Sequence, residues 1–202
     1  MKVIVFGAGK VGRALVISLG KKHKVTIVDH SRETCDEVAA ETNANVICGD
    51  ATDPDLLEEL KVSEADYIFA VTGSEETNFL VSVYAKHMNA KKVISRVSEM
   101  KYSSLMERLG VEPLVPEQTL ARELANRVLN PLISLMLDPT NSNVQLLEKD
   151  IEGQLKGKTV EEVQKKHEFI IISVYHQGKF VFPKPDFVLE GGMTAVVVKH
   201  GS

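Results

Sequence analysis

The pattern of hydrophobic and polar positions divides the chain into short elements of two kinds. Through about residue 115, β-branched runs alternate with amphipathic helical stretches, which is typical of βαβ units around a parallel sheet. Several runs, such as Val3-Ile4-Val5-Phe6, carry almost no polar alternation, as expected for strands that helices cover on both faces. The pattern predicts an α/β fold, a Rossmann-type doubly wound parallel sheet, whose six strands are expected at residues 2–6, 24–29, 45–48, 67–71, 92–97 and 112–115.

Helix signals agree with this division. Asp53 can accept hydrogen bonds from the free N–H groups of a helix that begins at Pro54, since proline is tolerated at the first helical position. After residue 115 a long helical pattern runs to about residue 137, and Asn130-Pro131 is expected to kink it. We interpret this segment as a crossover helix with an apolar face available to a partner, formed by Leu120, Leu124, Val128, Leu132 and Leu135.

The last third of the chain has a different pattern. Residues 138–143 are rich in turn formers and indicate a domain boundary. Beyond them, strands are expected at 144–151, 169–176, 179–182 and 194–199, and Thr159-Val160-Glu161-Glu162 is a capping box that opens a short helix. The predicted organisation is a Rossmann domain at 1–116, a crossover helix at 117–137 and a small α+β domain at 138–202. A unit of roughly 65 residues barely buries its own core, and dimerisation is one way to cover it.

Composition narrows the classes of partner. Twenty-four basic and 28 acidic residues are spread along the 202-residue chain without a basic block, so nucleic acid is not expected as a partner. No apolar run approaches the roughly 20 residues that cross a bilayer, and the chain enters a strand at once instead of a secretory signal, so cytoplasmic residence is expected. Cys35 and Cys48 lack the spacing of a zinc site, and we interpret both as small buried or half-buried side chains.

A glycine motif supplies the first candidate chemistry. Gly7-Ala8-Gly9-Lys10-Val11-Gly12 follows the first expected strand and opens the first helix, which is the context in which such a motif binds a dinucleotide. Gly7 allows a tight turn, Gly9 lets the backbone approach a pyrophosphate, and Gly12 lets the helix pack closely on the strand. The helix N-terminus offers free N–H groups and a positive partial charge to phosphates.

An acidic residue completes this signature. Asp29 stands at the end of the second expected strand, where a carboxylate accepts hydrogen bonds from ribose hydroxyls and repels a 2′-phosphate. The pair of features favours NAD or an adenine nucleotide over NADP. In the alternative, the glycine turn only packs a helix tightly and the position of Asp29 is a coincidence.

Enzymatic patterns fit less well. A P-loop needs Lys-Ser or Lys-Thr after its last glycine, and Arg13-Ala14 follow Gly12 here. The one Tyr-x-x-x-Lys pair, Tyr175 and Lys179, spans an expected hairpin turn. We therefore expect the protein not to be an enzyme, and keep a small NAD-dependent oxidoreductase as the alternative.

Further short segments follow the expected strands. These are Cys48-Gly49-Asp50-Ala51-Thr52, Val71-Thr72-Gly73 with Glu76 and Asn78, Ile94-Ser95-Arg96-Val97, and Val115-Pro116-Glu117. With the glycine turn and Asp29, they make the chain resemble, over essentially its whole length, the TrkA-like regulatory proteins of Trk and Ktr potassium uptake systems, the RCK or KTN family. The end of the chain resembles that family's small TrkA-C domain.

The resemblance assigns roles to individual residues. It implies that Asp50 and Ala51 lie beside the adenine, that Thr72 and Gly73 line the phosphate or second-nucleoside side, and that Arg96 reaches toward the ligand. From the residues alone, Asp50 also fits a turn or capping aspartate and Arg96 a surface ion pair. The expected cofactor-binding set is Gly7, Ala8, Gly9, Lys10, Val11, Asp29, Asp50, Ala51, Thr72, Gly73 and Arg96.

Two charged residues carry further implications of the resemblance. Lys10 stands where many relatives carry arginine, close to the phosphates and available to a neighbouring subunit's nucleotide. Glu117 matches a glutamate that in some relatives helps to hold a divalent cation between subunits, although a glutamate favoured by the helix dipole explains it equally well.

The implied function is regulatory. The resemblance implies a cytoplasmic subunit that senses NAD(H) or ATP and ADP, and that gates a potassium channel or transporter through ligand-dependent subunit rearrangement. It also implies a homo-oligomer, either a dimer or a larger tetramer or octameric ring, at the inner face of the membrane through a membrane-embedded partner. An adaptor for a transporter of another ion stays open, because no residue here specifies potassium.

Overall fold

The structure is a computed structural model that describes residues 1–138 and 144–200. The chain divides into two compact units, Met1–Ala121 and Arg122–Ser202. Within the described residues, none of the helices is both long and apolar enough to cross a membrane.

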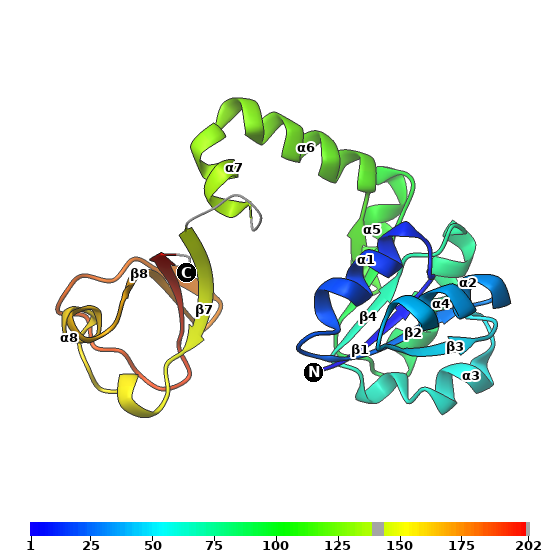
Figure 1. Cartoon of the computed structure of the whole chain (residues 1–202), viewed down its shortest axis with the longest axis horizontal. Coiled ribbons are helices and arrows are strands. Elements are labelled where there is room, and N and C mark those ends of the chain that lie inside the picture. The colour runs from blue at the N-terminus through cyan, green and yellow to red at the C-terminus, as the bar shows by residue number, and fades with distance from the viewer. Residues whose placement is uncertain (139–143, 201–202) are drawn as a thin grey trace. The chain divides into compact units, whose positions relative to one another are not determined.

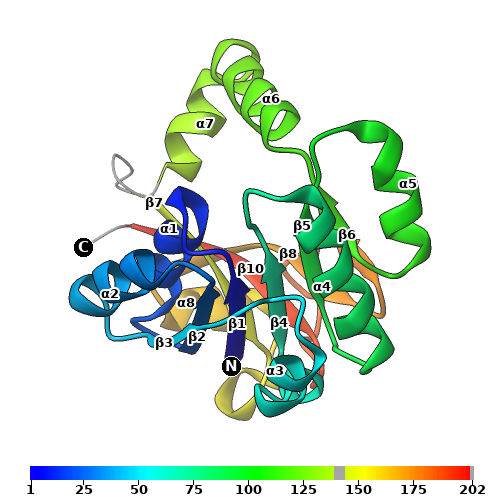
Figure 2. The same cartoon turned by 90° about the vertical axis from the view of Figure 1, so that its right-hand side faces the viewer.

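The first unit is built on a six-stranded parallel sheet, as predicted. Its spatial order is β3-β2-β1-β4-β5-β6, and Figure 2 shows β2, β1, β4 and β5 side by side. The order reverses at β1, which lies between β2 and β4, and open α/β sheets bind ligands at such a switch point. The strands are β1 (Lys2–Phe6), β2 (Lys24–Asp29), β3 (Asn45–Cys48), β4 (Tyr67–Ala70), β5 (Val93–Arg96) and β6 (Glu112–Leu114).

Helices cover both faces of this sheet. The side chains of Val3 and Val5 belong to one buried cluster, with Val16 of α1 and Val38 of α2. Their neighbours in β1 point the other way, into a second cluster with residues of α3, α4 and α5. Burial on both faces explains why the strand lacks polar alternation. The helices are α1 (Lys10–Leu19), α2 (Arg32–Glu41), α3 (Pro54–Glu59), α4 (Glu75–His87) and α5 (Met100–Arg108), with a 3₁₀ turn at Val62–Glu64 (Figure 1).

The expected crossover helix is two helices, α6 (Pro116–Leu129) and α7 (Pro131–Leu137). The predicted kink at Asn130-Pro131 is a complete break. Asn130 has φ −137° and ψ 59°, outside the helical region, because a following proline disfavours the helical conformation and supplies no N–H.

The second unit contains a four-stranded antiparallel sheet in the order β7-β10-β8-β9. One face packs on α8 (Val160–Lys166), whose predicted capping box is present between Thr159 and Glu162. Of the turn-forming run expected at 138–143, residues 139–143 lie outside the described residues. The strands are β7 (Val144–Asp150), β8 (Phe169–His176), β9 (Lys179–Val181) and β10 (Thr194–His200), with a 3₁₀ turn at Gly153–Leu155.

Candidate nucleotide-binding site

The glycine turn has the geometry that its sequence predicts. Gly7 has φ +104°, and a Cβ there would lie 2.7 Å from the backbone nitrogen of Thr72. A Cβ on Gly12 would lie 1.9 Å from the carbonyl oxygen of Gly7. Both positions therefore require glycine. A Cβ on Gly9 would meet nothing within 4 Å, so this middle glycine of the motif faces open space, where a ligand could approach the backbone.

The N-terminus of α1 differs from those of its neighbours. Ser31 and Ser74 accept hydrogen bonds from the first turns of α2 and α4. The N-cap of α1 is Gly9, which gives no such bond, and the exposed residues Lys10 and Val11 follow it. The first-turn N–H groups of α1 are thus open to an anionic ligand.

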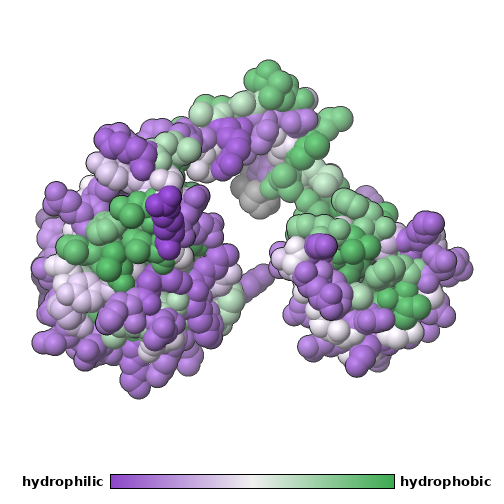
Figure 3. Space-filling model, turned by 180° about the vertical axis from the view of Figure 1, so that it is seen from behind, coloured by the Kyte–Doolittle hydropathy of each residue, from purple (hydrophilic) through white to green (hydrophobic). Residues whose placement is uncertain are grey.

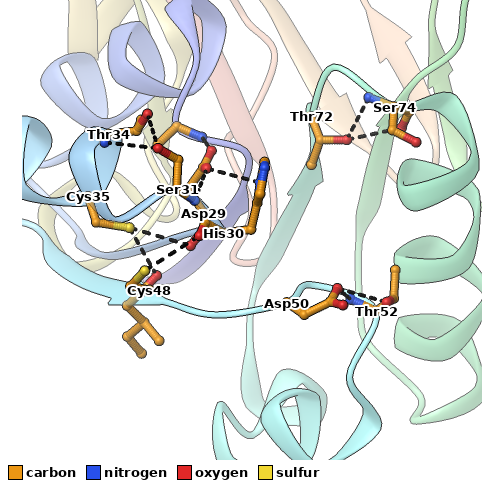
Figure 4. A network of polar contacts seen from close by, with 12 residues as sticks. Asp29, His30, Ser31, Thr34, Cys35, Cys48, Asp50, Thr52, Thr72 and Ser74 are labelled. Atoms are coloured by element: carbon orange, nitrogen blue, oxygen red, sulfur yellow. Dashed lines mark hydrogen bonds and ion pairs between the residues drawn. The ribbon is translucent and has the colours of Figure 1, made fainter.

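Asp29 faces the glycine turn from the end of β2, with 14% of its side chain exposed. Its Oδ2 accepts a hydrogen bond from the backbone N–H of Ala8 at 2.7 Å, and its Oδ1 accepts one from Ser31 at 2.9 Å. His30 Nδ1 lies 3.3 Å from Oδ1 (Figure 4). A carboxylate has about four acceptor positions, so Asp29 can hold both turns and still accept ribose hydroxyls. Its structural bond to Ala8 was not foreseen from the sequence.

Asp50 and Ala51 follow β3 at the same edge of the sheet. Oδ1 of Asp50 accepts hydrogen bonds from the Thr52 backbone at 2.8 Å and hydroxyl at 2.7 Å (Figure 4). These bonds, with a smaller contribution from the charge of His30, lower the pKa of Asp50. Asp50 is thus a turn aspartate, and its exposed carboxylate remains ionised for a ligand as well.

A buried asparagine connects the ends of β4 and β5. Asn78, which is 1% exposed, accepts a hydrogen bond from the Thr72 backbone N–H at 2.9 Å. Its amide donates to the carbonyls of Thr72 and Arg96 at 3.3 and 3.2 Å. In the sequence, Asn78 contributes only to the family resemblance, and its role in joining the two strand ends was not predicted. The available signal was an asparagine on the apolar face of a helix just after a strand end.

Gly73 and Arg96 have few restraints. A Cβ on Gly73 would meet nothing within 4 Å. Within the part of the chain that the structure describes, half-buried Arg96 makes no ion pair within 4.0 Å, so the surface ion pair weighed as an alternative is not present there.

The expected site residues share one edge of the sheet without all touching. Ala8 contacts Asp29, and Gly7 packs against Thr72. Asp50 follows the end of β3, and Arg96 is the last residue of β5, so both lie at the same carboxyl edge of the sheet. A cavity of about 840 Å³ is lined by apolar and acidic residues of α4 and α5, together with Ser74 and Val97, and contains none of the expected cofactor-binding residues. We therefore place the candidate nucleotide site by its geometry, at the carboxyl edge of the sheet.

Glu117 lies in the first turn of α6. Among residues 1–138 and 144–200, no group of three or more His, Cys, Asp or Glu side chains could hold a metal ion. The described residues of one chain thus form no set of ligands for a divalent cation at Glu117.

Fold and site together define a Rossmann-type nucleotide-binding unit joined to a small α+β unit. The TrkA-N domain family matches residues 3–116, and the chain belongs to this family. It is 32% identical to a Trk system potassium uptake protein TrkA homolog of Methanothermobacter thermautotrophicus, over 98% of this chain and 94% of the relative. It is 31% identical to a TrkA homolog of Archaeoglobus fulgidus over 98% of this chain. The chain spans about half of that relative and of two from Methanosarcina mazei, at 47%, 45% and 46% of their lengths.

Solved structures share the fold at low identity. The GsuK RCK domain has a TM-score of 0.51 at 22% identity, over 98% of this chain and 45% of that one. The human SLO3 gating ring has a TM-score of 0.65 at 12% identity, over 98% and 43%. These likenesses establish an RCK-like fold for the chain.

Proposed function

We propose that the chain is a nucleotide-sensing regulatory subunit of a potassium channel or transporter. The observation that carries this proposal is the uncapped N-terminus of α1, with open space at Gly9 and the carboxylate of Asp29 beside the same turn. The name of the Methanothermobacter relative, a potassium uptake protein, supports the potassium system.

The proposed ligand is NAD(H) or an adenine nucleotide such as ATP or ADP. Phosphates would lie at the N–H groups of Lys10 and Val11, and ribose hydroxyls would bind Asp29, which repels a 2′-phosphate. Asp50 and Ala51 would border the adenine. GsuK has been solved with NAD and with ADP, and a Kef C-terminal domain of Shewanella denitrificans with AMP, which supports this class of ligand.

The far side of the ligand would meet the ends of β4 and β5. Gly73 leaves room for the ligand, and the guanidinium group of Arg96 has no ion-pair partner among the described residues. Asn78 would act as a positioning residue, because it holds the backbones of Thr72 and Arg96 at this edge.

Subunit association would carry the signal. Leu124, Val128 and Leu132 on α6 and α7 are exposed, Val128 at 80%, and Figure 3 shows hydrophobic residues on the surface of this segment. We propose that the segment 117–137 makes the contacts of a homo-oligomer, a dimer or a larger tetramer or octameric ring, on the cytoplasmic side of a membrane partner. Nucleotides would shift its arrangement if they bind two arrangements with different free energies.

Two further features bear on this proposal. Tyr175 and Lys179 lie on either side of the β8–β9 turn, and the Tyr175 ring packs on Phe180 with centroids 4.9 Å apart. This placement offers no support for the alternative, a small NAD-dependent oxidoreductase.

A divalent cation at Glu117 would need ligands from a second subunit.

Calorimetric titration with NADH, NAD, ATP, ADP and NADP tests the ligand proposal. Asp29→Asn keeps one acceptor for the two backbone N–H groups but loses the charge, so we expect it to bind the preferred nucleotide at least tenfold more weakly. Asp66→Asn is the matched control, because Asp66 lies just before β4, at the amino-terminal ends of the strands and away from the candidate site. The proposal fails if no nucleotide binds, or if both variants bind like the unchanged protein.

A further inference from the structure

The fold brings together the two cysteines of the chain, which are 13 positions apart in sequence. Cys35 lies on α2 and Cys48 ends β3, and both are free thiols. Cys48 pairs in register with Asp29 across the β2–β3 ladder. The pair therefore lies beside the candidate ribose position.

Backbone contacts locate both sulfur atoms. Cys35 Sγ lies 3.4 Å from the carbonyl oxygen of Asp29 and 3.8 Å from that of Ile47, the residue before Cys48. Cys48 Sγ lies 3.7 Å from the carbonyl oxygen of His30. The two sulfurs thus contact successive carbonyls of one turn, and Figure 4 shows them on the same side of it.

The two thiols differ in access. Cys35 is 4% exposed, whereas Cys48 is exposed to solvent, so the expectation of a buried or half-buried side chain is wrong for Cys48. Burial, and then the hydrogen bond and charge of the neighbouring Cys48, raise the pKa of Cys35 to about 11. An external reagent will therefore react with Cys48 first. Cys35, which is buried, is suited to attack the modified Cys48 in a second step.

We infer that Cys35 and Cys48 form a thiol pair that closes to an intramolecular disulfide through exchange with a low-molecular-weight disulfide. The Cys48 thiolate attacks the reagent's S–S bond, forms a mixed disulfide, and releases one thiolate of the reagent. The Cys35 thiolate then attacks Cys48 Sγ, forms the Cys35–Cys48 bond and releases the second. Two electrons pass to the reagent, and the two protons lost by the cysteines leave with its two thiols.

Closure would change the turn that carries Asp29. A disulfide sulfur has no S–H to donate, so the contacts to the carbonyls of Asp29 and His30 are lost while α2 is drawn toward β3. This step of the inference rests on the proposed function: we expect the oxidised protein to bind its nucleotide several-fold more weakly, with recovery on reduction.

Oxidised glutathione is the reagent for the test, without nucleotide present. Mass spectrometry and thiol titration should show a monomer that loses two hydrogens and both free thiols. Cys35→Ser should stop at a stable glutathione adduct on Cys48, and Cys48→Ser should keep Cys35 reduced. The second step should accelerate about tenfold for each pH unit between roughly 7 and 9, as the thiolate fraction of Cys35 rises. A stable adduct on Cys48 of the unchanged protein, or two thiols that stay free, would overturn the inference.

Nucleotide titration of the reduced and oxidised protein then tests the link to the site. Equal affinity of the two forms would overturn that link. Absence of binding to the reduced protein would instead count against the proposed function, since the thiol chemistry is measured without nucleotide.

Discussion

Substitution of two glycines of the same turn separates folding from ligand binding. A Cβ at position 12 would lie 1.9 Å from a backbone carbonyl oxygen, which no side-chain rotation can relieve. Forcing such a group into a packed site costs about 1–3 kcal/mol. The better helix propensity of alanine returns roughly 1 kcal/mol. Because the clashing atom is backbone, we place Gly12→Ala at the upper end, with a net loss of about 2 kcal/mol in the free energy of unfolding.

Gly9→Ala is the matched substitution. Its Cβ would meet nothing within 4 Å, and φ is −68°, so alanine fits the backbone and should cost about 0.5–1 kcal/mol, because alanine is a poorer N-cap than glycine. The added methyl group would, however, stand where the backbone is expected to approach the phosphates. We expect nucleotide affinity to fall about tenfold, which corresponds to about 1.4 kcal/mol.

Urea unfolding followed by circular dichroism measures the first effect, because the chain has no tryptophan. Calorimetry with the preferred nucleotide measures the second. If Gly9→Ala lost as much stability as Gly12→Ala, the open space at Gly9 would be wrong. If Gly9→Ala bound nucleotide as tightly as the unchanged protein, phosphates would not approach this backbone.

Three further substitutions test other parts of the structure. Asn78→Ala should lower the free energy of unfolding by about 2–4 kcal/mol, because buried polar groups of Thr72 and the next strand lose their partner; a loss below about 1 kcal/mol in urea unfolding would contradict this. The hydrogen bond from Lys91 lowers the pKa of Asp66, so its stabilisation is present above pH ~4 and is lost as pH falls through the lowered value. The difference in urea midpoint between the unchanged protein and Asp66→Asn should therefore shrink from about pH 5 to pH 2, and a constant difference would refute the assignment. Leu132→Glu should shift the protein toward monomer in light scattering, and an unchanged mass would exclude α7 from the subunit contact.

The sequence alone determined the strands, the helix caps and the glycine turn. Runs of apolar and β-branched residues predicted all six strands of the first unit, with ends within one residue of those observed. The signal is clearest for β1, because a strand buried on both faces is almost continuously apolar. The capping residues Asp53 and Thr159 were equally readable, since capping depends on neighbours a few positions away. The requirement for glycine at positions 7 and 12 followed from the motif and its local context.

Only the tertiary structure decided which distant residues meet. The hydrogen bond from Ala8 to Asp29 spans 21 positions, and the bond from Asn78 to the Arg96 carbonyl spans 18. Cys35 and Cys48 lack a recognisable spacing, and their contact depends on how α2 packs beside the end of β3. Such contacts are set by sheet order and helix packing, which a local pattern does not contain. For this reason the sequence predicted that a ligand binds at the carboxyl edge of the sheet. Only the structure placed Asn78 between two strand ends and Cys35 near Cys48.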